Sequence, residues 1–156
     1  WLEDHSTDLA VREIYGDMLL NNGDNAGALA QYEIFLKSRS DIPSVLNNAA
    51  WLLRDSNPGR ALDLAAKAAL LAPRSAEITD TYGWLLLQKK DAKNALTQLQ
   101  RAHSIAAANG EITYHLALAY AAVGNKAAAK QSLQDAIAKG GNFTDIADAR
   151  KMLQKM

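Results

Sequence analysis

An internal repeat of about 34 residues is the feature that most constrains how this chain can fold. Three kinds of residue recur with the same spacing of 33, 34 and 34 residues. The first column holds small residues, the second alanines and the third short polar residues: Gly16, Ala49, Gly83 and Ala117; Ala28, Ala61, Ala95 and Ala129; Asp24, Asn57, Asp91 and Asn125. Chance rarely places three columns on one period, even in an alanine-rich chain. The sequence therefore predicts four repeats that bury their apolar faces against one another.

Local signals divide each repeat into two helices. The polar column precedes an apolar-periodic stretch, where a short side chain can accept the free N–H groups of a helix start. Pro58 follows Asn57, and proline suits the first helical position because no hydrogen bond is lost there. The predicted helices are 9–21 with 25–38, 43–55 with 58–71, 76–88 with 92–106, and 110–122 with 126–139, followed by a ninth helix over about 144–155.

The composition agrees with a helical chain and excludes several functions. Of 156 residues, 30 are alanine and 22 leucine, which favour helices. Seventeen basic residues balance seventeen acidic ones, which argues against a nucleic-acid-binding arm or a polybasic membrane patch. The absence of cysteine excludes disulfides and cysteine-ligated zinc. No apolar run is long enough to cross a membrane, so no direct insertion of this segment is expected. A start at Trp1 rather than Met suggests a piece of a longer protein.

The repeat resembles the tetratricopeptide repeat (TPR), a 34-residue helix–turn–helix unit. The family has Gly or Ala at its eighth position and Ala at its twentieth, as the small and alanine columns do here. Its twenty-seventh position is also Ala, met by Ala68, Ala102 and Ala136, whereas Phe35 departs from the pattern. The resemblance implies an all-α, right-handed superhelix forming one domain over 1–156. We expect repeats at about 9–41, 42–75, 76–109 and 110–141, with a capping helix at about 144–155.

A narrower resemblance rests on three runs of residues, 45–53, 80–86 and 111–117. Runs like these occur in this order near the C-terminal end of long bacterial TPR proteins, many of them lipoproteins, tied to exopolysaccharide production and exosortase protein sorting. The resemblance implies a periplasmic or envelope location, although composition leaves the cytoplasm open. It also implies that Trp1–His5 is the tail of a preceding repeat's second helix.

The catalytic inventory of the chain is thin. It contains no phosphate-binding glycine loop, no nucleophile elbow and no His-Glu-x-x-His motif. The three histidines, His5, His103 and His115, are far apart in the sequence, and ordinary packing or exposure is the simpler interpretation for each. No acidic pair stands out as acid and base. We therefore expect a protein that is not an enzyme and that uses no metal and no cofactor.

The most informative surface is the one that first helices present in TPR arrays, where a concave groove binds ligands. Transferring the family's groove positions to this chain gives a set of acids, amides and aromatics. The candidate partner-binding residues are Glu13, Asp17, Asn21, Asn47, Arg54, Glu77, Asp80, Thr81, Trp84, Gln88, Tyr114 and His115. The alternative is that many of these side chains are only solvated, and that Trp84 packs against its neighbours.

These observations lead to an expected function and a rival. The expected function is a non-catalytic scaffold that binds a protein or peptide segment, with no role for nucleic acid. The rival is a structural module that forms homo-oligomers through its ends or outer face. Residues 1–78 carry a net charge of −4 and residues 79–156 a net charge of +4, a dipole that could orient such contacts or could be accidental.

The groove composition also predicts which partner segments are disfavoured. Some TPR domains bind a C-terminal carboxylate with Lys, Arg and Asn from three first helices. The matching positions here retain only Asn47, and Glu13, Asp17 and Glu77 are acidic. An acidic tail placed there would meet like charge. We therefore expect a preference for segments with basic and apolar groups, with Asp17 and Asp80 pairing with the cations.

Overall fold

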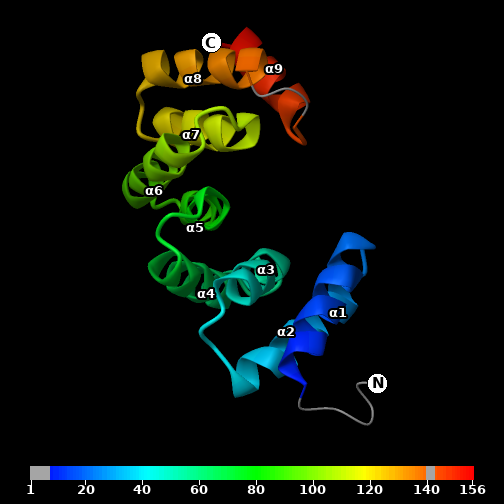
Figure 1. Cartoon of the computed structure of the whole chain (residues 1–156). Coiled ribbons are helices and arrows are strands. Elements are labelled where there is room, and N and C mark those ends of the chain that lie inside the picture. Colours follow the sequence, from blue (N-terminus) through cyan, green and yellow to red (C-terminus); the bar gives the residue numbers. More distant parts are fainter. Residues whose placement is uncertain (1–7, 140–142) are drawn as a thin grey trace. The chain divides into compact units, whose positions relative to one another are not determined.

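The structure is a computed structural model that describes residues 8–139 and 143–156, and all of its regular structure in these ranges is helical (Figure 1). Four helix pairs are followed by a final helix. In chain order the helices are α1 (Leu9–Asn21), α2 (Asn25–Ser38), α3 (Pro43–Leu53), α4 (Pro58–Leu71), α5 (Ala76–Gln88), α6 (Ala92–Ile105), α7 (Gly110–Ala122), α8 (Lys126–Lys139) and α9 (Ile146–Gln154). The all-helical class, the four pairs and the final helix are therefore confirmed.

The observed helix bounds differ from the predicted ones in three places. Helix α3 ends at Leu53, because the Arg54 N–H turns back to the Trp51 carbonyl and the Asn57 N–H bonds to the Leu53 carbonyl. Helix α6 ends one residue early, at Ile105. Helix α9 covers Ile146–Gln154 rather than about 144–155. The proposed helix tail at Trp1–His5 lies outside the described residues.

The polar column caps the second helix of every pair. Each of its four side-chain oxygens accepts a backbone N–H three residues further on; the pairs are Asp24 with Gly27, Asn57 with Arg60, Asp91 with Asn94, and Asn125 with Ala128. The preceding turns use a left-handed backbone at Gly23 and Gly124, and at Lys90, where φ is 63°. Capping and turn geometry therefore explain why the period appears so clearly in the sequence.

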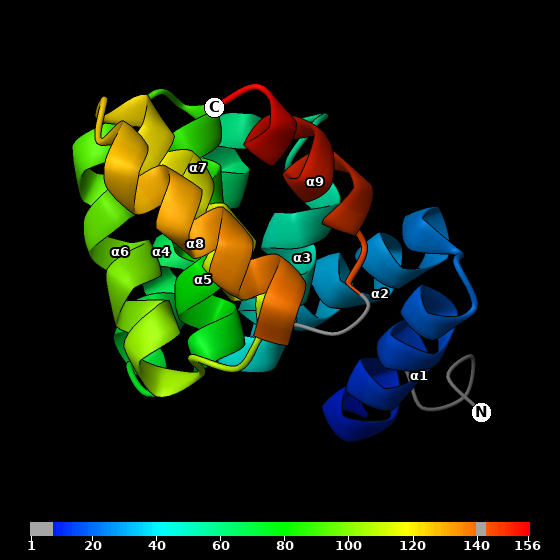
Figure 2. The same cartoon turned by 90° about the horizontal axis from the view of Figure 1, so that it is seen from above.

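The chain divides into two compact units after Ala72. Unit 1 holds α1 to α4, in which α1 packs on α2, α2 on α3, and α3 on α4. Unit 2 holds α5 to α9, in which α5 packs on α6 and α7, α6 on α7, α7 on α8, and α8 on α9 (Figure 2). The single domain, the repeat limits and the right-handed superhelix stay predictions.

Small residues allow each hairpin to close. All four alanines of the second column are fully buried, and all four residues of the first column are buried. A Cβ atom added at Gly16 would lie 2.7 Å from Tyr32 Cε1 in unit 1, and one added at Gly83 would lie 2.7 Å from Leu99 Cγ in unit 2. Helices approach closely only where the facing side chains are small. The first column therefore sets how tightly each first helix packs on its second helix.

The last helix covers the apolar side of unit 2. Ala149 of α9 is fully buried against Leu133 and Ala136 of α8 and against Tyr114 and Ala117 of α7. The partly buried side chains in this contact include Met152, Leu153 and Phe143. Ile146, at the start of α9, is half-buried and lies outside this cluster. The exposed side chains of α9 are mostly polar, among them Asp148, Arg150 and Lys151.

We predict that Gly83→Ala destabilises unit 2. The new Cβ atom would meet the fully buried Leu99 at its branch point, which cannot swing away. Such overpacking should lower the free energy of unfolding by about 1–3 kcal/mol. The matched control is Gly59→Ala in α4, where the nearest atom is Asn57 Oδ1 at 4.0 Å. Chemical denaturation should show the control unchanged or stabilised by up to about 1 kcal/mol. Equal stability of the two variants would contradict the packing argument.

We also predict that Ala149→Arg loosens α9. A long charged side chain cannot occupy the fully buried Ala149 site without displacing the cluster around Leu133. The melting temperature should fall, and binding of an apolar dye should rise as the cluster is exposed. Ala147→Arg, on the exposed side of the same helix, is the control and should melt like the original chain. Identical melting of both variants would show that α9 does not cover this unit.

Candidate interaction surface on the first helices

The structure places the twelve predicted partner-binding residues in two sets, one in each unit. In unit 1, Glu13, Asp17, Asn47 and Arg54 are half-buried and Asn21 is exposed. In unit 2, Glu77 and Gln88 are exposed and Thr81 and Trp84 are half-buried, whereas Asp80, Tyr114 and His115 are buried. The exposed and half-buried members can meet a partner directly. The buried ones lie beneath them.

In unit 1, the Asp17 carboxylate is bound by other side chains of the chain. Its Oδ1 accepts hydrogen bonds from the Tyr32 hydroxyl at 2.5 Å and from Asn48 Nδ2 at 3.2 Å. Asn48 Nδ2 also lies 3.3 Å from the Tyr32 oxygen, which closes a three-residue network across α1, α2 and α3. Burial of Tyr32 and its bond to Asp17 raise the pKa of the Tyr32 hydroxyl. The repeat pattern does not reveal this network, because its three members lie 15 to 31 residues apart and come from different helices.

Two further predicted residues of unit 1 also have partners within the unit. Glu13 Oε1 accepts a hydrogen bond from the Ser44 hydroxyl at 3.0 Å, which links α1 to α3. The Arg54 guanidinium lies 4.3 Å above the centre of the Trp51 ring and donates to the Trp51 carbonyl at 2.7 Å. Asn47 Oδ1 is buried and has no hydrogen-bond partner in the described part of the chain. Of these contacts, the bond between Ser44 and Glu13 joins two helices, whereas those of Arg54 are to the neighbouring Trp51.

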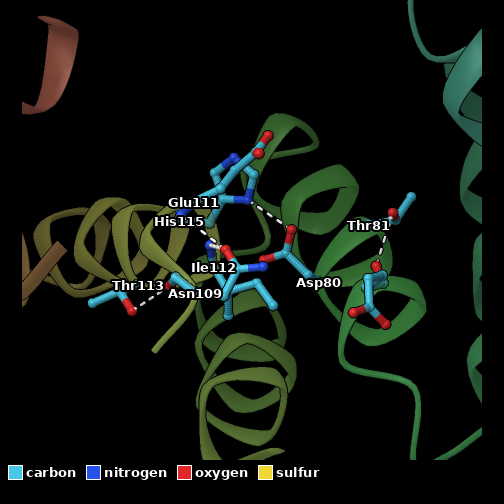
Figure 3. A network of polar contacts seen from close by, with 8 residues as sticks. Asp80, Thr81, Asn109, Glu111, Ile112, Thr113 and His115 are labelled. Carbon is cyan, nitrogen blue, oxygen red and sulfur yellow. Dashed lines mark hydrogen bonds and ion pairs between the residues drawn. The ribbon is translucent and has the colours of Figure 1, made fainter. Parts of the chain in front are cut away.

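In unit 2, a buried ion-pair geometry joins α5 to α7. His115 Nδ1 lies 2.8 Å from Asp80 Oδ2, and Figure 3 shows the two side chains pointing toward each other from neighbouring helices. The second Asp80 oxygen is buried with no hydrogen-bond partner among the described residues. The Thr81 hydroxyl donates to the Glu77 carbonyl at 3.0 Å, and Asn109 caps the start of α7 at Glu111 and Ile112. The register of α5 against α7 is therefore set by polar contacts as well as by packing.

Aromatic rings continue from this pair to the C-terminal part of unit 2. The ring centres of Trp84 and His115 are 6.2 Å apart, those of His115 and Tyr114 are 6.0 Å apart, and those of Tyr114 and Phe143 are 6.0 Å apart. Burial, followed by the charges of Asp145 and Asp148, raises the pKa of the Tyr114 hydroxyl. Three of these rings belong to the predicted partner-binding residues. Of the three, Trp84 is half-buried, whereas Tyr114 and His115 are buried. The alternative that Trp84 packs against its neighbours thus describes part of its environment, and its contact with a partner stays a prediction.

No cluster of three or more His, Asp or Glu side chains with metal-binding geometry occurs among residues 8–139 and 143–156. His103 Nδ1 lies 3.2 Å from the Thr113 hydroxyl, and His5 is outside the described ranges. None of the described helices combines the length and apolar character needed to cross a lipid bilayer.

We predict that the Tyr32 network makes stability fall at high pH. The raised pKa means that the folded chain keeps the Tyr32 proton above pH 10.0, the ordinary value, whereas the unfolded chain loses it. The contribution of Tyr32 is therefore fully present below about pH 10 and declines above it, by about 1.4 kcal/mol per pH unit. Denaturation between pH 9 and 11, on the order of the phenol pKa, should show a shallower decline for Tyr32→Phe. Tyr15→Phe, which changes an exposed tyrosine, is the control and should behave like the original chain. If the stability of Tyr32→Phe falls with pH as steeply as that of the original chain, the raised pKa of Tyr32 is contradicted.

Comparison with solved structures supports the fold described above. No protein-family model and no curated protein sequence matches the chain. Among solved structures, the chain is similar to YrrB, a TPR protein with an unusual peptide-binding site, at 19% identity and a TM-score of 0.79, covering 96% of this chain and 78% of YrrB. It is similar to the 41-to-end segment of MamA from Desulfovibrio magneticus RS-1, at 20% identity and a TM-score of 0.74, covering 96% and 88%. It is also similar to TTC0263, a thermophilic TPR protein in Thermus thermophilus, at 19% identity and a TM-score of 0.76, covering 94% and 80%. The chain therefore has the tetratricopeptide-repeat fold.

Proposed function

We propose that the chain is a non-catalytic protein-interaction module that holds a segment of a partner against the first helices of its repeats. The observation that carries this proposal is the outer side of α5. Glu77 and Gln88 are exposed there, and Thr81 and Trp84 are half-buried between them. Acid, hydroxyl, aromatic and amide groups thus follow one helix, which is the mixture that protein-binding surfaces use.

The packing below this surface favours binding. The first helices lie on fully buried alanines of the second helices, so their backbones are held in place before any partner arrives. In unit 2 the contact between Asp80 and His115 also fastens α5 to α7. A surface that is already ordered loses little conformational entropy on binding. The likeness in fold to YrrB, which has a peptide-binding site, supports the same role.

The proposed setting is the bacterial envelope. The three runs of residues that resemble exopolysaccharide- and exosortase-associated TPR proteins support a role in polysaccharide export or protein sorting, in the periplasm. The full-length gene product gives the direct test. A signal peptide with a lipidated cysteine supports this setting, whereas a cytoplasmic product without one contradicts it.

A second candidate function is self-assembly, and the outer side of α1 favours it. Ile14, Tyr15 and Met18 of α1 are exposed, with Ile14 at 60% and Met18 at 56%. Apolar side chains that follow one helix are a common feature of protein interfaces. Light scattering across a range of concentrations separates the two functions. A molecular mass that rises with concentration supports self-assembly, provided that the double variant Ile14→Lys with Met18→Lys stays at the monomer mass. A monomer mass at every concentration supports the scaffold.

Site-specific photo-crosslinking tests the scaffold proposal. A photoreactive amino acid at Gln88, exposed on the first helix α5, should form crosslinks to a partner in cells that produce the full-length protein. The same group at Lys93, exposed on the second helix α6, is the matched control and should form few. Equal crosslinking at the two positions, or none at Gln88, would contradict binding along the first helices.

A further inference from the structure

Charge in unit 2 is divided between its first and second helices. The first helices α5 and α7 contain the acids Glu77, Asp80 and Glu111 and no lysine or arginine. The second helices α6 and α8 carry exposed basic side chains, among them Lys93, Arg101, Lys126 and Lys130. Helices α5 and α7 also pack on each other. The net charge of zero for the whole chain conceals this division.

The acids of the two units differ in what already binds them. In unit 1, Asp17 accepts bonds from Tyr32 and Asn48, and Glu13 accepts one from Ser44. In unit 2, the exposed Glu77 and the half-buried Glu111 form no salt bridge with any described basic side chain. Ser75, a neutral hydroxyl, donates to Glu77 at 3.1 Å. Asp17 is thus engaged by two side chains of its own unit, and its pairing with a cation of the partner stays a prediction.

Asp80 is the third acid of α5 and α7. It is mostly buried, and His115 holds one of its oxygens, while the other is buried without a hydrogen-bond partner in the described ranges. Figure 3 shows Asp80 and His115 at the α5–α7 contact, with Glu111 on the first turn of α7. Asp80 is thus engaged within the unit, whereas the exposed Glu77 and the half-buried Glu111 are the acids of these helices that a partner can reach.

We propose that the first helices α5 and α7 of unit 2 select, through Glu77, Glu111 and Trp84, a partner segment that carries lysine or arginine between apolar residues. This inference rests on the proposed scaffold function and names the chemistry of its ligand. The basic head groups pair with Glu77 and Glu111, and the aliphatic stems or apolar neighbours contact the half-buried Trp84. An acidic segment is rejected because it meets like charge and no compensating lysine or arginine on either helix.

Fluorescence anisotropy with labelled synthetic peptides tests this selectivity on the full chain. Two peptides share the same leucine and alanine residues, and one carries Lys and Arg where the other carries Glu. We expect the basic peptide to bind at least about tenfold more tightly at low salt, and its affinity to fall as salt is added. The variant Glu77→Gln with Glu111→Gln keeps the size and hydrogen-bonding capacity of both side chains. It should weaken binding of the basic peptide about threefold to tenfold.

The control variant is Glu33→Gln with Asp63→Asn, which removes the same number of charges from the second helices α2 and α4. It should leave the dissociation constant of the basic peptide unchanged. Equal affinity for both peptides, with crosslinking at Gln88 intact, would overturn the charge selectivity and leave the scaffold proposal standing. The charge selectivity is also overturned if the two double variants bind the basic peptide with equal affinity. Failure of every peptide to bind, together with no crosslinking at Gln88, would contradict both proposals.

Discussion

The contact between each first helix and its second helix, at one small residue, is the constraint on which the rest of this structure depends. At Gly16 and Gly83 the facing Tyr32 and Leu99 leave no room for a Cβ atom. At Ala49 and Ala117 the methyl group is accommodated and fully buried. Because both helices are held this closely, the hairpin has one packing arrangement. That arrangement decides which side chains of the first helix face away from the hairpin.

Sequence reasoning predicted the helices well because their signals are local. Caps such as Asp24 and Asn57 act within three residues, and the small columns report contacts inside one repeat. The polar contacts between helices could not be predicted in the same way. Asp80 and His115 are 35 residues apart, and Asp17 meets Tyr32 and Asn48 across three helices. Such pairs depend on the rotation of each helix and on its register against the next, which a periodic pattern leaves open.

These interhelical contacts change the functional interpretation of the candidate surface. In unit 1, Asp17 and Glu13 accept hydrogen bonds from side chains of neighbouring helices. In unit 2, one acid is buried against His115, while Glu77 and Glu111 remain on the surface with no lysine or arginine on their own helices. Glu13 and Asp80 occupy the same position of their repeats, and each contacts a side chain of the next first helix, Ser44 and His115 respectively. The roles of the candidate residues in recognition stay predictions.

The central claim is that the first helices of unit 2 form a preordered surface for a basic, apolar segment. An NMR titration of the isotope-labelled full chain with the basic peptide tests it most directly, because every amide reports separately. We expect chemical-shift changes concentrated on α5 and α7, around Glu77, Trp84 and Glu111, with the helix content unchanged. Changes concentrated on α6 and α8, or a titration with the acidic peptide that gives the same changes at the same concentrations, would contradict it.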